Sequence, residues 1–131
     1  MDKHLVFVYG SLKSGGDIRG LNQFGEGAVI VGKAKTTYPD YHMADLGAFP
    51  GVFLGGDKYI QGEVWEVNDK VMEELDAIEG YPNFYNRVKT QTSKGKAWMY
   101  YLDSKEYGSF YADNPKSDNI EDIDNTLIWN L

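Results

Sequence analysis

Glu79 is the residue whose position best suits acid–base chemistry. Apolar residues recur at helical spacing from Val71 to Ile78 and Gly80 follows, which predicts that Glu79 lies in the last turn of a helix. A carboxylate there faces the negative end of the helix dipole, so its ionisation is disfavoured. A carboxyl group with a raised pKa suits a general acid or base that works near neutral pH. The alternative is an ordinary solvated surface glutamate.

A second segment, Val8-Tyr9-Gly10-Ser11-Leu12-Lys13, has the features of an anion-binding turn. A buried strand runs into Gly10, whose missing Cβ permits a tight turn and the close approach of a ligand to the backbone. The amides of Ser11 and Leu12 could then point at one spot and bind a carboxylate or a carbonyl oxygen. The alternative is a plain turn at the end of a strand.

Arg87 follows the helix closely and could pair with Glu79, Asp76 or another acid. An ordinary salt bridge made from a strand is the role we favour for it.

The sequence lacks the residues that cysteine chemistry, metal binding and a phosphate loop require. The chain has no cysteine, which removes disulfides, thiolate catalysis and cysteine–zinc sites. The two histidines, His4 and His42, are far apart and show no metal-ligand spacing, so we expect neither a metal nor a cofactor. The run from Gly27 to Lys33 resembles a phosphate loop only superficially, because its middle reads as a strand and Ala34 replaces the required Ser or Thr.

The elements that must position these segments are mainly strands. Short β-branched and aromatic stretches predict about six strands, and one firm helix is expected at 69–79 with a possible short helix near 18–24. The apolar end at 127–129 is expected to dock on the body. The prediction is one α+β domain over residues 1–131, with a curved sheet or small mixed β-barrel and packed helices. The candidate strands are 5–9, 28–37, 41–46, 59–67, 85–92 and 97–102, with a short strand piece at 52–54.

The net charge and the length of the apolar runs exclude some classes of partner and location. The formal net charge is −7, so nucleic acid and anionic membranes would repel the chain. The N-terminal apolar run, Leu5 to Tyr9, is shorter than a secretory signal core and far shorter than the about 20 residues of a membrane span. A cytoplasmic location is therefore predicted, with oligomeric state left open.

The ordered motifs resemble the γ-glutamylcyclotransferase-like family, also called AIG2-like. Members share a first strand that ends in Tyr-Gly-Ser/Thr-Leu, then Leu-Asp-x-x-Glu-Gly, then Tyr-x-Arg. The matching segments are Tyr9-Gly10-Ser11-Leu12, Leu75-Asp76-Ala77-Ile78-Glu79-Gly80 and Tyr85-Asn86-Arg87, within a resemblance that spans roughly residues 4 to 102. The first segment looks closer to the γ-glutamylamine cyclotransferase branch than to the glutathione-degrading members.

The resemblance implies a fold and a set of site residues. The fold is a small closed or nearly closed β-barrel with packed helices. Glu79 matches the catalytic glutamate. The expected substrate-binding residues are Tyr9, Gly10, Ser11, Leu12, Tyr85 and Tyr100, the first four through the turn.

The resemblance also implies a reaction on a small γ-glutamyl substrate, in which 5-oxoproline and a free amine are released without metal or cofactor. One alternative is a ligand-binding or interaction module on the same fold with no turnover. Another is a deprotection or amidotransfer enzyme that applies the same chemistry to a larger substrate. The sequence leaves the leaving amine open.

Overall fold

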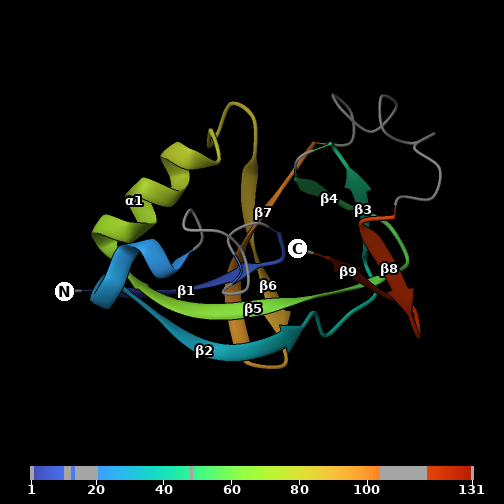
Figure 1. Cartoon of the computed structure of the whole chain (residues 1–131), viewed down its shortest axis with the longest axis horizontal. Helices are drawn as coiled ribbons and strands as arrows, with labels where there is room; N and C mark the ends of the chain where they lie inside the picture. Colours follow the sequence, from blue (N-terminus) through green and yellow to red (C-terminus); the bar gives the residue numbers. More distant parts are fainter. Residues whose placement is uncertain (1, 11–12, 14–20, 48, 104–117, 131) are drawn as a thin grey trace.

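The protein is mainly β-structure with one α-helix among the residues that its computed structural model describes, which are 2–10, 13, 21–47, 49–103 and 118–130 (Figure 1). A seven-stranded sheet and a two-stranded sheet carry the fold. The helical elements are the 3-10 helix η1 (Leu21–Gly27) and the helix α1 (Asp69–Ile78). The strands are β1 (Lys3–Val8), β2 (Ala28–Lys35), β3 (Tyr41–Asp45), β4 (Pro50–Leu54), β5 (Tyr59–Asn68), β6 (Asn86–Thr92), β7 (Gly95–Tyr101), β8 (Ile120–Ile123) and β9 (Thr126–Trp129).

Strand β5 is the centre of the larger sheet. The sheet runs in the order β6-β7-β1-β5-β9-β8, and β2 pairs with the other edge of β5. β1 and β2 both run antiparallel to β5, whereas β9 pairs parallel to its first residues. At Gly62 a Cβ would lie 2.2 Å from the Val8 carbonyl oxygen, so only glycine allows β1 and β5 to approach this closely.

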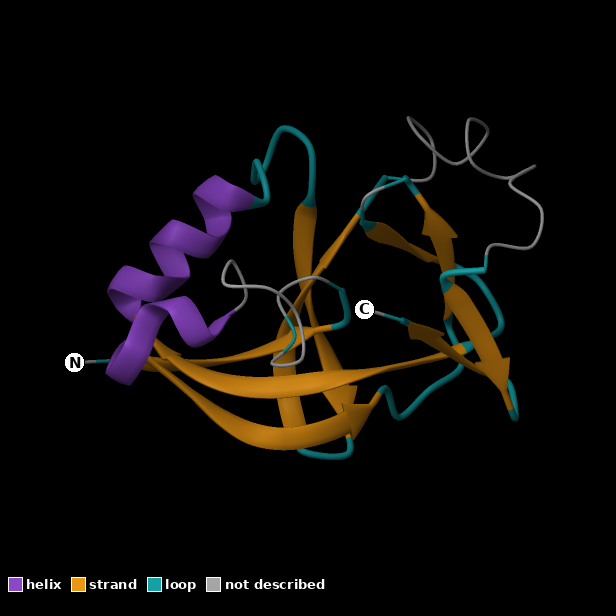
Figure 2. Ribbon diagram, viewed as in Figure 1, coloured by secondary structure: helices purple, strands orange, loops and turns teal. Residues whose placement is uncertain are grey.

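The larger sheet curls until its two ends meet. Thr36, just beyond β2, forms an isolated bridge with Thr92 at the end of β6. The Thr37 amide donates to the Gln91 carbonyl at 2.8 Å next to this bridge. Figure 2 shows the long strands curving around the interior with the helices at one end. The predicted α+β fold with a small mixed barrel is confirmed as a curled half-barrel.

The second half of β1, from Val6 to Val8, is buried on both faces, which explains the apolar run from Leu5 to Tyr9. Val6 and Val8 belong to one core cluster, together with the buried residues of α1. Phe7 and Tyr9, which point the opposite way, belong to a second cluster. A strand between two cores needs no polar face, and it reads as a continuous hydrophobic run.

The helix α1 begins and packs as its sequence predicts. The Asn68 side chain accepts a hydrogen bond from the Val71 amide at 2.9 Å and thereby caps the first turn. Val71, Met72 and Leu75 are buried against the sheet, and their spacing forms one apolar stripe. The predicted helix at 69–79 thus ends one residue early, with Glu79 as its C-cap.

The predicted number of strands needs correction, and two further predictions concern the ends of the chain. The described residues form nine strands and not about six, chiefly because the C-terminal region makes the β8–β9 hairpin. The apolar end does dock on the body, as expected, by pairing β9 with β5. The short helix predicted near 18–24 lies partly outside the described residues, and the described part is η1 at 21–27.

Candidate active site

Backbone hydrogen bonds fix Glu79 at the end of α1. The Gly80 amide donates to the Ala77 carbonyl at 3.2 Å, and the Tyr81 amide donates to the Asp76 carbonyl at 2.9 Å. These two backbone bonds form the Schellman pattern. The pattern needs a left-handed residue, and Gly80 supplies it with φ of +66°. The predicted glycine stop is confirmed, and it leaves Glu79 in a fixed backbone conformation at the helix end.

The Glu79 carboxyl group is largely removed from water. Burial raises the pKa of Glu79 to about 7, from an ordinary value of 4.5. Among the described residues, none forms a hydrogen bond or ion pair with this carboxyl. Without a cation or donor to stabilise its charge, the group stays near the midpoint of its titration at neutral pH.

Tyr9, the last residue before the glycine turn, lies near Glu79. Burial raises the pKa of Tyr9 well above its usual range, and the charges of Tyr85 and Glu79 raise it further. The Tyr85 amide donates to the Glu79 carbonyl at 3.3 Å, and the Tyr85 hydroxyl donates to the carbonyl of Pro50, which packs against Gly10. The two segments that the sequence singled out, at the end of β1 and at the end of α1, therefore meet at one place.

Gly10 packs against the start of β4. A Cβ at Gly10 would lie 2.8 Å from two ring carbons of Pro50, so no larger residue fits without a shift. The Lys13 amide donates to the Gly10 carbonyl at 3.0 Å, so the chain turns at Gly10 as predicted. The close approach that Gly10 permits is thus made by Pro50 in this structure.

The tyrosine hydroxyls hold the frame of the site. Tyr9 donates to the Tyr100 carbonyl at 2.7 Å, and Tyr85 donates to the Pro50 carbonyl at 2.7 Å. The Tyr100 hydroxyl donates to Asp76 at 2.8 Å. As donors these hydroxyls are already engaged, so their first contribution is to fix the segments around Glu79.

Asp76 and Arg87 form an ion pair beside this frame. The Arg87 Nη1 atom lies 2.9 Å from each carboxylate oxygen of Asp76. The guanidinium carbon lies 4.6 Å from the ring centroids of both Tyr81 and Trp98, so the cation is held between two aromatic faces. Of the partners that the sequence left open for Arg87, the structure selects Asp76.

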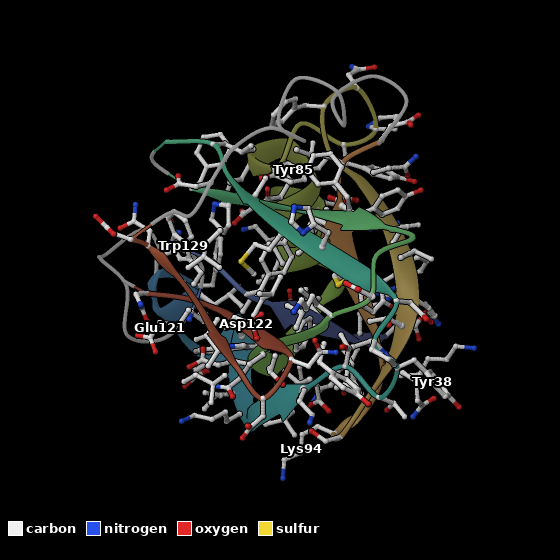
Figure 3. All side chains as sticks on the ribbon, turned by 90° about the vertical axis from the view of Figure 1, so that its right-hand side faces the viewer. Tyr38, Tyr85, Lys94, Glu121, Asp122 and Trp129 are labelled. Atoms are coloured by element: carbon white, nitrogen blue, oxygen red, sulfur yellow. The ribbon has the colours of Figure 1, made fainter. Side chains whose placement is uncertain are left out.

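An aromatic cluster that the sequence analysis missed borders the same region. The Phe84 and Tyr85 rings are 4.9 Å apart, and Phe49 lies 6.5 Å from each. Figure 3 shows Tyr85 at the end of the molecule opposite Lys94 in the β6–β7 turn. Nothing local in the sequence indicates that Phe49 or Pro50 would meet Tyr85.

The structure places most of the predicted site residues together. Tyr9, Gly10, Glu79, Tyr85 and Tyr100 are linked by the contacts above. Ser11 and Leu12, the predicted amide donors, lie outside the described residues. So do two tyrosines of the C-terminal segment that could not be placed from sequence, Tyr107 and Tyr111.

The described residues offer neither a metal site nor a membrane-spanning helix. They contain no group of three or more His, Asp or Glu side chains arranged to hold a metal ion. Nor do they include a helix that is both long and apolar enough to cross a membrane.

Comparison with known proteins assigns the family. The family model described as "Gamma-glutamyl cyclotransferase, AIG2-like" matches residues 6–123. A gamma-glutamylcyclotransferase family protein of Escherichia coli K12, YtfP, is 33% identical over 95 residues, which cover 72% of this chain and 79% of the relative. A Vibrio cholerae protein, named as a candidate gamma-glutamylcyclotransferase, is 37% identical over 98 residues, 75% of this chain and 81% of that protein. The chain therefore belongs to the AIG2-like gamma-glutamyl cyclotransferase family.

Solved structures agree on the fold. The crystal structure of an AIG2-like protein from Mus musculus matches with a TM-score of 0.67 at 23% identity, and the match covers 78% of each chain. The solution structure of ytfP from Escherichia coli matches with a TM-score of 0.58 at 31% identity, over 75% of this chain and 81% of that one. The curled half-barrel with its packed helix is thus the fold of these AIG2-like proteins.

Proposed function

We propose that this protein is a γ-glutamylcyclotransferase that releases 5-oxoproline and a free amine from a small γ-glutamyl amide, with Glu79 as its acid–base residue. The observation that carries the proposal is the Glu79 carboxyl group, which is buried beside the end of β1 and has a pKa of about 7. Family membership supports the same reaction class.

The reaction is an intramolecular aminolysis. The α-amino nitrogen of the γ-glutamyl group attacks its own γ-carbonyl carbon, and the bond from that carbon to the leaving nitrogen breaks. Nucleophile and electrophile belong to one molecule, so an enzyme that holds the chain folded gains much of the proximity effect. The products are a five-membered lactam and an amine, and no water is consumed.

Glu79 relays protons from the attacking nitrogen to the leaving nitrogen. The attacking nitrogen loses two protons on going from an ammonium group to the lactam N–H, and the leaving nitrogen gains one to depart as an amine and a second as that amine becomes an ammonium ion. An α-amine with pKa near ~8 is mostly protonated at neutral pH and must lose a proton before it attacks. The leaving nitrogen must gain a proton before it departs. A carboxyl group with a pKa of about 7 can accept the first proton and return it to the second nitrogen. The backbone of the turn after Tyr9 then serves to bind the developing oxyanion or the substrate α-carboxylate.

The test replaces Glu79 by its neutral isostere. Glu79→Gln keeps the shape of the side chain and removes the proton acceptor, so 5-oxoproline release from a panel of γ-glutamyl amides should fall by on the order of 10²-fold or more. Glu73→Gln is the matched control, because Glu73 is exposed on the same helix. Turnover in the Glu79 variant equal to that of the control would remove Glu79 from the mechanism.

The same panel separates an enzyme from a binding module. A wild-type protein that binds γ-glutamyl amides in calorimetry but releases no 5-oxoproline would contradict the cyclotransferase proposal. A preference within the panel would identify the leaving amine.

A further inference from the structure

The Asp76–Arg87 ion pair leaves the neighbouring Glu79 carboxyl group without a partner among the described residues. Asp76 and Glu79 are three residues apart on the last turn of α1, so both carboxyl groups lie on the same side of the helix. Asp76 accepts hydrogen bonds from Arg87 and from Tyr100. Glu79 accepts none from the described residues, although a cation lies close to its neighbour.

Tyr100 connects this ion pair to the other half of the site. Its hydroxyl donates to Asp76 on α1, and its carbonyl accepts the Tyr9 hydroxyl at the end of β1. One residue of β7 thus ties the helix end to the strand that leads into the glycine turn. A substitution of Asp76 would therefore affect both the end of α1 and the end of β1, because Tyr100 bonds to both.

Arg87 is placed where its charge would matter if it were unpaired. Its side chain is 20% exposed and that of Asp76 is 23% exposed, so water screens the pair only weakly. The Nε atom of Arg87 is buried without a hydrogen-bond partner, which leaves Asp76 as the described carboxylate that compensates the cation. Both Arg87 and Glu79 act electrostatically on Tyr100, in opposite directions.

The titratable and charged groups of this site come from the end of β1, from β6 and β7, and from α1 itself. They contribute no unpaired cation among the described residues, and this is consistent with burial as the cause of the raised pKa of Glu79. The Glu79 charge acts on Tyr9 at the end of β1 and on Tyr100 of β7. Asp76 of α1 and its partner Arg87 of β6 act on the same Tyr100 hydroxyl.

We propose that Asp76 is a positioning residue for this site: it pairs with the Arg87 charge so that Glu79 remains the unpaired carboxyl group, and it orients the Tyr100 hydroxyl. The catalytic consequence rests on the proposed function of Glu79. The electrostatic part does not, and it can be measured in the absence of any substrate.

The first experiment is Asp76→Asn, which keeps the shape of the side chain and an oxygen acceptor for Tyr100. The unpaired Arg87 cation should stabilise the Glu79 carboxylate, so the Glu79 pKa should fall by roughly one unit or more. Carbon-detected NMR titration of the Glu79 carboxyl carbon measures this shift directly, with Glu79→Gln used to assign the signal. The acid limb of the kcat/KM profile should move to lower pH by the same amount.

A double variant separates charge pairing from structural support. Asp76→Asn with Arg87→Gln removes both charges and keeps two polar side chains that can bond to each other. The Glu79 titration should return to within a few tenths of a unit of wild type, because the local net charge is restored. If the ion pair only supports the fold, the double variant should differ from wild type more than Asp76→Asn does, because both partners of the pair are then replaced.

The outcomes distinguish this inference from the proposed function. An unmoved Glu79 titration in Asp76→Asn, or a shift that the double variant fails to reverse, overturns the positioning role. A shift that reverses as expected, in a protein that turns over no γ-glutamyl amide, supports the electrostatic role and contradicts the cyclotransferase activity. If the double variant does not fold, the direction of the titration shift in Asp76→Asn alone decides the matter.

Discussion

Glu79 occupies a position that opposes its own ionisation in two ways. It caps the C-terminal end of α1, where the helix dipole disfavours negative charge, and it is buried away from water. A position of this kind costs folding free energy whenever the group is ionised. Such a cost is typical of functional residues, whose environment serves the chemistry at the expense of stability.

This cost predicts how stability should change with pH. Folded Glu79 keeps its proton up to about pH 7, whereas the unfolded chain loses it near 4.5. The unfolded state therefore binds fewer protons between these values, and the free energy of unfolding falls as pH rises through this window and levels off above it. Glu79→Gln does not titrate, so it should be more stable than wild type at pH 8, by about 3 kcal/mol for a shift of this size, and equal at pH 4.

Urea unfolding at the two pH values measures the difference. Glu73→Gln is again the control, because it makes the same substitution at an exposed position of the same helix. A Glu79 variant whose advantage is the same at pH 4 and pH 8 would show that burial does not hold the proton on this group.

The sequence indicated Glu79 as the candidate acid–base residue, but it could not show which acid pairs with Arg87. Glu79 breaks the usual preference for cations at a helix end, which is visible without a structure. Asp76 and Glu79 share one face of the helix, so spacing alone allows either to meet Arg87. The choice depends on where Tyr81 and Trp98 hold the guanidinium, and those rings are placed by tertiary packing.

At the scale of elements, the helix that carries Glu79 depends on its opposite end. Asn68 is the N-cap, and its side-chain oxygen satisfies the Val71 amide. Asn68→Ala should cost about 1 kcal/mol of stability, because a backbone donor of the first turn loses its partner. Thermal unfolding should show a midpoint lower by a few degrees.

Two variants make that result specific. Asn68→Asp keeps the acceptor oxygen and should restore the wild-type midpoint. Lys70→Ala changes an exposed residue of the same turn and should have little effect. A midpoint unchanged in Asn68→Ala would mean that tertiary packing alone fixes the start of α1.

The elements best predicted from sequence are those with a clear period. The helix was expected at 69–79 and forms at 69–78, and the central strand was expected at 59–67 and forms at 59–68. β8 was missed because Ile120–Ile123 contains two acids and is mostly exposed. Its own sequence therefore shows no apolar pattern that predicts a strand paired with β9. A curved sheet or barrel was expected from the strand pattern, and the family resemblance implied a closed or nearly closed barrel, but no local pattern encodes the contact between Thr36 and Thr92.

At the scale of the whole molecule, the C-terminal hairpin completes the second core cluster. Leu127 and Trp129 of β9 are buried with Phe7 and Tyr9, on the face of β1 opposite the helix. The Lys13 ammonium donates to the Trp129 carbonyl at 2.7 Å, so the hairpin also contacts the residue that closes the glycine turn. Figure 3 shows Trp129 on β9, well separated from the β6–β7 turn at Lys94.

Leu127 tests whether this hairpin is part of the cooperative fold. Leu127 is 6% exposed, and Leu127→Ala removes packing that the surrounding side chains cannot fully replace, so it should cost about 2–4 kcal/mol. Ile123→Ala is the matched control: Ile123 lies on β8 of the same hairpin, is 50% exposed, and should cost well under half as much. Chemical unfolding gives both values. If Leu127→Ala costs no more than the control, the hairpin opens independently of the half-barrel, and β9 cannot be what holds the end of β1 and the Lys13 turn in place beside Glu79.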